Sequence, residues 1–299
     1  MRARCVACAG VMLVAGCGAE QQVPVVQQPV KVARCVLRFH DPRAGIEARA
    51  RLKREISQYV STRPGRIVYA AHDLVTGVRL GQGEQQSDLI TASGAKVDIV
   101  MALLAGRGGG LDESEQDLAT RMIKESDNSA ADAMWSRVGG GGAMESFYRR
   151  AGLRHTAPGP GVYWGGTTTS PADRIRLLKV LVKGGRGLGA RDRRLVLSLM
   201  EQVNKEQAWG VSAAARPGDR VALKNGWTPR PFVSGTWAVT SYGRIVGPGR
   251  DLLLSVQTDH QPGEAAGVAT VEGIARLIGA RLDSLSPTTT RRCPTNRIG

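Results

Sequence analysis

The ten residues TASGAKVDIV (91–100) place Ser93 three positions before Lys96, where an apolar run begins. Apolar positions at helical spacing predict a core helix over residues 93–105. These positions are Val97, Val100, Met101 and Leu104. The serine could simply cap this helix, with the lysine in solvent. It could also be a nucleophile beside its base, because the start of a helix stabilises an anion and a desolvated lysine loses its proton readily.

Two further groups favour the second interpretation. Ser126-Asp127-Asn128 lies in a predicted interhelical loop, and Lys224-Asn225-Gly226 lies in a predicted strand. Taken singly, the first could cap a helix and the second could end a strand. In this order, S-x-x-K, S-D-N and K-T-G are the three elements of class A β-lactamases and penicillin-binding proteins. The chain resembles that superfamily over most of residues 46–284. The segments WGGTTTSPADRIRLL and HDLVTG resemble it as well.

The resemblance implies a role for each motif residue. Ser93 would be the acylated nucleophile and Lys96 its activating partner. Ser126 would relay a proton to the leaving nitrogen, and Asn128 would bind the substrate amide. Lys224 would supply positive potential for a substrate carboxylate.

The third motif would complete the substrate site. Asn225, Gly226 and Trp227 are expected to bind substrate, with the backbone N–H groups of Trp227 and Ser93 forming the oxyanion hole. Asn225 stands where the family carries a serine or threonine, so an amide replaces the hydroxyl expected to bind a carboxylate.

A second departure concerns release of the acyl group. Class A β-lactamases use a loop glutamate to activate water, but no Asp or Glu occurs between Glu145 and Asp173. Without a general base, water is a poor nucleophile, so deacylation is expected to be slow. His155 or Tyr163 could substitute.

The order of predicted elements gives the fold class. A first helix and a hairpin precede a helical region over about residues 93–203, and three strands and a last helix follow it. This order predicts an α+β fold, with an antiparallel five-stranded sheet flanked by the terminal helices and an inserted all-helical subdomain. The elements outside the insert are expected at residues 46–63, 66–84, 220–227, 235–246, 251–259 and 267–282.

The N-terminus has the pattern of an export signal. Two arginines precede a short apolar stretch, which is too short to span a bilayer. Residues 14–17 resemble a lipoprotein lipobox, which would leave Cys17 lipidated on the outer face of the cell membrane; an ordinary secretory signal is the alternative. The predicted segments are a signal peptide at 1–16, a tether at 17–45, the hydrolase domain at 46–284 and a tail at 285–299.

The chain has five cysteines, and these predict one disulfide. Cys5 and Cys8 leave with the signal peptide and Cys17 takes the lipid. Cys35 and Cys293 then remain in an oxidising compartment and are expected to pair, joining the two chain ends.

Charge and composition exclude several other classes. The net charge of +15 suits an anionic envelope, and no nucleic-acid-binding motif accompanies it. The four histidines are too scattered for a zinc site and lie in no nucleophile-elbow context, so neither a metal nor a cofactor is expected. These histidines are His40, His72, His155 and His260.

The favoured hypothesis is therefore an envelope-anchored serine hydrolase that forms an acyl-enzyme at Ser93 with a β-lactam or a cell-wall peptide. One alternative is a D,D-peptidase or transpeptidase that β-lactams inhibit. Another is a non-catalytic envelope-binding lipoprotein that retains the hydrolase fold.

Overall fold

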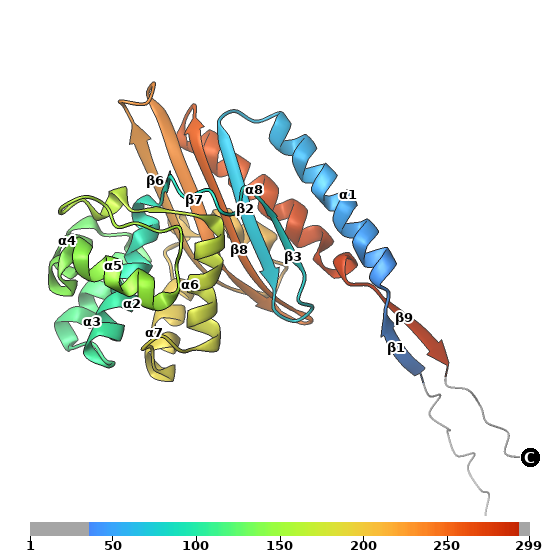
Figure 1. The fold of residues 1–299 in the computed structure, drawn as a ribbon, viewed down its shortest axis with the longest axis horizontal. Coiled ribbons are helices and arrows are strands. Elements are labelled where there is room, and N and C mark those ends of the chain that lie inside the picture. Colours follow the sequence, from blue (N-terminus) through green and yellow to red (C-terminus); the bar gives the residue numbers. More distant parts are fainter. Residues whose placement is uncertain (1–35, 293–299) are drawn as a thin grey trace, which may run out of the picture. The chain divides into compact units, whose positions relative to one another are not determined.

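The computed structural model of the protein describes residues 36–292, within which Arg38–Thr289 form one compact unit. The centre of this unit is an antiparallel five-stranded sheet in the order β3-β2-β8-β7-β6 (Figure 1). The predicted hairpin and the three later strands therefore join one sheet. These strands are β2 (Arg66–Asp73), β3 (Arg79–Gln82), β6 (Arg220–Arg230), β7 (Thr236–Gly247) and β8 (Arg250–Gln261).

Helices cover both faces of the sheet (Figure 1). The first and last helices, α1 (Pro42–Ser61) and α8 (Glu264–Arg281), pack together on one face. The inserted subdomain covers the other face, so the α+β fold predicted from the sequence is confirmed. Its helices are α2 (Ala95–Arg107), α3 (Glu113–Thr120), α4 (Asn128–Val138), α5 (Gly140–Ala151), α6 (Pro171–Lys183) and α7 (Ala190–Glu201).

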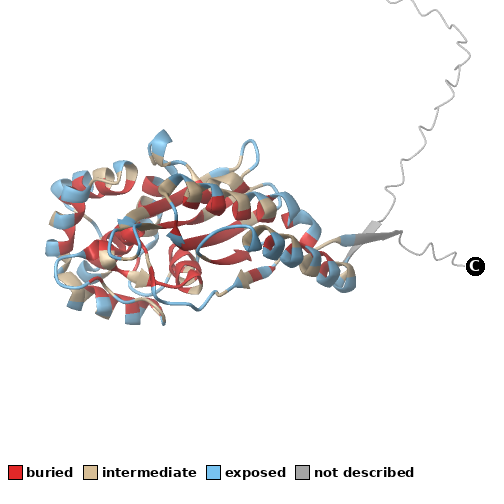
Figure 2. Ribbon diagram, turned by 90° about the horizontal axis from the view of Figure 1, so that it is seen from above, coloured by how far each residue is buried: buried red, intermediate tan, exposed pale blue. Residues whose placement is uncertain are grey.

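The sheet separates two hydrophobic cores. Along β8, Leu252 and Leu254 join the core beneath α1 and α8, whereas Leu253 joins the core of the helical subdomain. This alternation follows from the two-residue period of a strand. Because helices cover both faces, most residues of the central strands are buried, and the exposed residues lie mainly on the outer faces of the helices and in loops (Figure 2).

Helix α2 is the central helix of the subdomain. The predicted core positions Val97, Val100, Met101 and Leu104 are buried, and so is every other residue from 95 to 104. The helix begins at Ala95, and Ser93 lies in the short 3₁₀ turn Ala92–Gly94 that precedes it. Ser93 therefore does not cap the helix. The other helices of the inserted subdomain pack around α2 and share one hydrophobic core with it.

Regular structure also extends beyond the predicted domain limits. Strand β1 (Val36–His40) pairs with β9 (Thr288–Arg292). Within the domain limits, a further short pair joins β4 (Leu89–Ile90) to β5 (Thr168–Thr169). Strand β1 falls within the range predicted as a tether, and β9 within the predicted tail. Cys17, Cys35 and Cys293 lie outside the described residues.

None of the helices described between residues 36 and 292 has the length and apolar character needed to cross a membrane.

Candidate active site

The turn that carries Ser93 is held from two sides. The Tyr242 hydroxyl of β7 donates to the Gly94 carbonyl at 2.8 Å, and the Thr91 N–H donates to the Thr167 carbonyl at 2.8 Å. Ala92 has a φ of 44°, in the left-handed region that alanine rarely occupies. Such conformations persist where surrounding contacts enforce them, and they concentrate at functional sites. Ser93 is thus presented by a fixed turn, with its side chain half-buried.

The third motif approaches this turn closely at Gly226. A Cβ atom there would lie 2.1 Å from the Thr91 carbonyl oxygen and 3.0 Å from the Ser93 nitrogen. A side chain would therefore force β6 away from the serine turn. Glycine is required at this position because the two backbones touch.

Lys96 is fully buried and contacts the second motif. Its Nζ donates to the Ser126 carbonyl at 2.6 Å, to the Ser126 Oγ at 3.1 Å and to the Asn128 Oδ1 at 2.7 Å. Burial lowers the pKa of Lys96 to about 7, against the opposing effect of Asp127 and Asp132. A large fraction of this amine is thus neutral near neutral pH. Within the described residues, Lys96 forms no hydrogen bond with the Ser93 Oγ, the contact that the sequence favoured.

Ser126 links the three motifs. It follows a π-helical turn, Arg121–Glu125, and adopts a left-handed conformation with φ 61° and ψ 33°. Lys224, 1% exposed on β6, donates to the Ser126 Oγ at 3.1 Å. Burial and the charge of Lys96 lower the pKa of Lys224 to about 7. The Ser126 hydroxyl therefore lies between two lysines that exchange protons near neutral pH.

Lys96, through its bond to Asn128, lies beside a cleft of about 430 Å³. The cleft contains the predicted residues Ser93, Asn128 and Trp227. It also contains side chains that the sequence did not single out. Its lining consists of Ala92, Ser93, Asn128, Asp132, Val162, Tyr163, Trp164, Gly165, Trp227 and Thr228.

The most informative additions are Asp132 and Trp164. The indole Nε1 of Trp164 donates to the Asp132 Oδ1 at 2.7 Å, and the Lys96 Nζ lies 4.8 Å from the centroid of the Trp164 ring. Asp132 is the one carboxylate among the described residues that line this cleft. Its spacing of four residues from Asn128 could have indicated that both lie on the same face of α4.

Asn225 departs from its predicted role. Its side chain is 1% exposed and donates to the carbonyls of Gln207 at 2.7 Å and Trp209 at 3.1 Å. Both amide hydrogens are therefore used within the protein, and the side chain does not line the cleft. A single polar residue after the motif lysine does not reveal such local partners.

The two proposed substitutes for the missing glutamate lie in different environments. His155 does not line the cleft; its backbone N–H donates to the Asp173 Oδ2 at 2.6 Å. Tyr163 does line the cleft, and its side chain is 55% exposed. Only Tyr163 is therefore positioned for a role there.

A buried ion pair fixes the helix that follows Ser93. The Arg174 Nη1 donates to both carboxylate oxygens of Asp98, at 2.7 and 2.8 Å, and both side chains are fully buried. Arg174 also donates to the Thr169 Oγ1 at 3.0 Å. The pair joins α2 to α6.

No group of three or more His, Cys, Asp or Glu side chains suited to a metal ion occurs within residues 36–292.

A five-stranded sheet with a helical insert, and a cleft serine beside a cluster of Ser126, Lys96 and Lys224, are the features of a β-lactamase-like serine hydrolase. The family model described as "Beta-lactamase enzyme family" matches residues 110–282, and the chain belongs to this family. Ser93 and Lys96 precede the matched segment.

The chain also has a sequence relative and structural relatives. The chain is 28% identical over 218 residues to "Putative lipoprotein LppW" of Mycobacterium tuberculosis, covering 70% of this chain and 68% of that protein. Among solved structures, the class A β-lactamase from Mycobacterium abscessus is 20% identical with a TM-score of 0.66, covering 77% and 99% of the two chains. A mutant of PBP-A, in an acyl-enzyme complex with penicillin G, is 21% identical with a TM-score of 0.66, covering 78% and 96%. These two structures establish the fold.

Proposed function

We propose that this protein is a serine hydrolase that forms an acyl-enzyme at Ser93 with a β-lactam or a peptidoglycan-like amide. One observation carries the proposal: the Ser126 Oγ lies 3.1 Å from both Lys96 and Lys224, beside the cleft that contains Ser93. This arrangement provides a base, a proton relay and a cation at the same place. The acyl-enzyme complex described for PBP-A supports this chemistry by analogy.

The residues account for each proton in acylation. The Ser93 Oγ attacks the amide carbonyl carbon, and neutral Lys96 takes the hydroxyl proton. The C–N bond breaks as Ser126 donates its proton to the leaving nitrogen. Ser126 recovers a proton from Lys96, which restores the neutral amine. The backbone N–H groups of Ser93 and Trp227 would stabilise the oxyanion.

Release of the acyl group is the slow step in this proposal. Hydrolysis needs a base that activates water. Asp132 is the carboxylate of the cleft, but its Oδ1 accepts the Trp164 indole N–H, and the indole ring lies over Lys96. These contacts favour an enzyme that β-lactams acylate and occupy over one that destroys them rapidly. A D,D-peptidase or transpeptidase that β-lactams inhibit fits the same geometry.

A fluorescent penicillin and a chromogenic cephalosporin test the proposal together. The wild-type protein is expected to gain one acyl group by intact mass, and the Ser93→Ala variant none. Little colour should develop from the cephalosporin. A Ser198→Ala variant controls for loss of a serine elsewhere, because Ser198 lies on α7, away from the cleft.

The outcomes separate the alternatives. Stable label that depends on Ser93 supports acylation with slow release, and label on a D-alanyl peptide ester would favour a D,D-peptidase. Rapid cephalosporin turnover would contradict the argument from the cleft carboxylate. Absence of label with every substrate would leave the non-catalytic binding protein.

Envelope localisation is part of the same proposal. The relative LppW is named as a lipoprotein, and residues 14–17 of this chain resemble a lipobox. Acyl chains on Cys17, detected by mass spectrometry of the membrane fraction, would confirm the anchor. Cleavage after a different residue, with an unmodified N-terminus, would indicate an ordinary secretory signal.

A further inference from the structure

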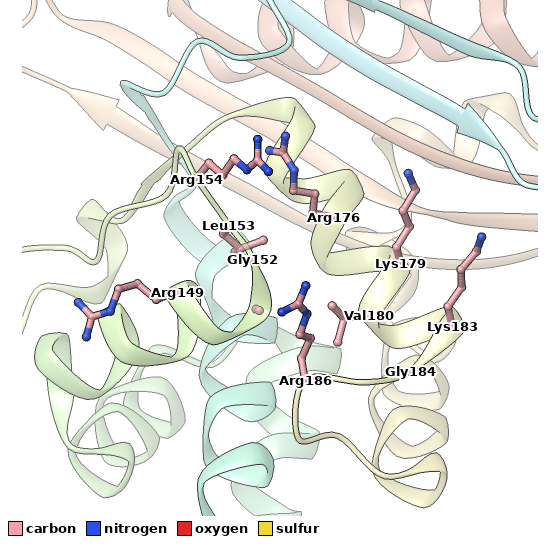
Figure 3. A pocket seen from close by; sticks show the side chains of 11 residues that line it. Arg149, Gly152, Leu153, Arg154, Arg176, Lys179, Val180, Lys183, Gly184 and Arg186 are labelled. Carbon is pink, nitrogen blue, oxygen red and sulfur yellow. The ribbon is translucent and has the colours of Figure 1, made fainter.

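A second and larger hollow lies away from the serine cleft. It measures about 620 Å³ and is bordered by the end of α5, the outer face of α6 and the loop after α6. Six of its eleven lining residues are Arg or Lys, and none is Asp or Glu. We name it the basic pocket; its cations are Arg149, Arg154, Arg176, Lys179, Lys183 and Arg186 (Figure 3).

Most of these charges have no carboxylate partner. Within the described residues, Arg154, Lys179, Lys183 and Arg186 form no ion pair. Arg149 pairs with Glu145 on its own helix and Arg176 with Asp173; in Figure 3, Arg149 points away from the other five side chains. Four uncompensated cations therefore share one concave surface.

Helix ends account for two of these cations, Lys183 and Arg186, and neither these two nor Arg154 fills a core. A cation in the last turn of a helix interacts favourably with the helix dipole, which accounts for Lys183 in α6. Arg154 and Arg186 lie in loops, and the Arg186 guanidinium lies beside Gly152, at the C-terminal cap of α5. Both are exposed, so neither fills a core.

The pKa values of two titratable groups, Lys179 and His72, are lowered by the positive charges of the basic pocket and its surroundings. Burial and then the charges of Arg79, Lys183 and Arg176 lower the pKa of Lys179. His72 borders the adjoining hollow that Lys179 also lines, and its pKa is lowered to about 4, by burial first and then by Lys179 and Arg79. The potential thus extends from the pocket toward β2. An anion in the pocket would relieve the repulsion among these cations.

We propose that the basic pocket binds a compact anion carrying two or more phosphate groups. Guanidinium groups match phosphate oxygens in pairs, and ammonium groups add point charges without geometric demands. Four unpaired cations call for a ligand of similar negative charge in a small volume. Pockets of roughly 300–1,000 Å³ accommodate such molecules. Two sources share this chemistry: a soluble oligophosphate, and a lipid headgroup that carries two phosphates.

Tripolyphosphate and lipid vesicles distinguish these sources. The full chain with Cys17→Ser, which lacks the proposed lipidation site, would be titrated with tripolyphosphate by calorimetry. The same protein would be sedimented with vesicles of phosphatidylcholine, with or without cardiolipin, whose headgroup carries two phosphates. A Lys183→Gln/Arg186→Gln variant removes two exposed charges of the pocket. Arg191→Gln/Arg194→Gln removes two exposed charges from α7, outside the pocket.

Binding of tripolyphosphate should weaken by about tenfold or more in the pocket variant and change by less than about twofold in the control. Sedimentation with the cardiolipin vesicles without binding of tripolyphosphate, lost in the pocket variant, would assign a lipid headgroup as the phosphate source. No binding to either probe would overturn the proposal, and so would equal losses in both variants. Unchanged thermal unfolding of the two variants confirms that each is folded.

Discussion

Lys96 and Lys224 donate to the same atom, the Ser126 Oγ, from opposite ends of the motif set and at the same distance of 3.1 Å. Two ammonium groups on one hydroxyl repel each other, so their protons leave in two linked steps. When one of the two amines is neutral and the other is protonated, the site contains a base and a cation at the same time. The proposed acylation uses both.

Acylation is therefore expected to depend on pH with a maximum. Lys96, with a pKa of about 7, becomes neutral as the pH rises through that value, so the rate should increase from about pH 5.5 toward neutrality. Once the second proton leaves at higher pH, the positive potential of Lys224 is lost and the rate should fall. Single-turnover labelling with fluorescent penicillin from pH 5 to 10 measures both limbs.

Substitutions at Lys224 and Lys96 separate the rising and falling limbs of this pH–rate profile. In Lys224→Gln the alkaline limb should disappear, because the group that loses the second proton is absent. In Lys96→Arg acylation should fall by about 100-fold or more at every pH, since arginine stays protonated. A pH-independent wild-type rate would contradict the assigned roles.

Replacement of Trp164 should convert slow release into turnover. Trp164→Glu places a carboxylate near Lys96 and frees Asp132 from the indole N–H. A general base at this position is expected to raise cephalosporin hydrolysis by about 100-fold. Trp164→Gln is the matched control, because it removes the same ring without adding a charge. If neither variant hydrolyses the cephalosporin faster than the wild type, the missing base does not limit release; equal increases in both would assign the base to the freed Asp132.

The buried pair of Asp98 and Arg174 should dominate the stability of α2. Arg174→Met leaves the Asp98 carboxylate fully buried without its cation, which is expected to cost about 3–5 kcal/mol of unfolding free energy. Asp98→Asn/Arg174→Met removes both charges and should recover much of that loss. Urea unfolding measures both values. If the double variant is no more stable than the single one, the loss reflects packing of the arginine and not the unpaired charge.

A terminal disulfide is expected between Cys35 and Cys293. The Asp41 N–H, just after β1, donates to the Pro287 carbonyl, just before β9, at 3.0 Å. Because the inner ends of the paired strands meet, β1 and β9 run antiparallel, and their outer ends, next to the two cysteines, lie at the same end of the ladder. Intact mass without reductant should be two hydrogens lower than after reduction. Alkylation of both thiols in unreduced protein would refute the pairing.

The sequence predicted the sheet and the convergence of the motifs well, because strand alternation and helix periodicity are local signals. Ser126 and Lys224 are far apart in the chain, and the order of known motifs was the only indication that they meet. The burial of Lys96 could not be predicted from the residues near it in the sequence. It depends on the Trp164 ring, which a later loop supplies.

Contacts made by irregular segments escaped prediction for the same reason. Asn225 faces the carbonyls of residues 207 and 209, which precede it in a stretch of 3₁₀ turns without periodicity. The bond between Asp132 and Trp164 joins a helix to a loop 32 residues later, and neither position carries a motif. Charge clustering in the basic pocket likewise arises only when α5 and α6 are folded together.

The contact of Trp164 with Asp132 bears on how much β-lactam the protein could take up in a cell. A protein that takes up one ligand per molecule and keeps it acts by stoichiometry, so the amount it can neutralise equals its copy number. Its effect in the envelope would follow how much of it a cell makes, and resynthesis would set the recovery time. One hydrogen bond in the cleft would thus decide whether the cell holds a catalyst or a finite supply of traps.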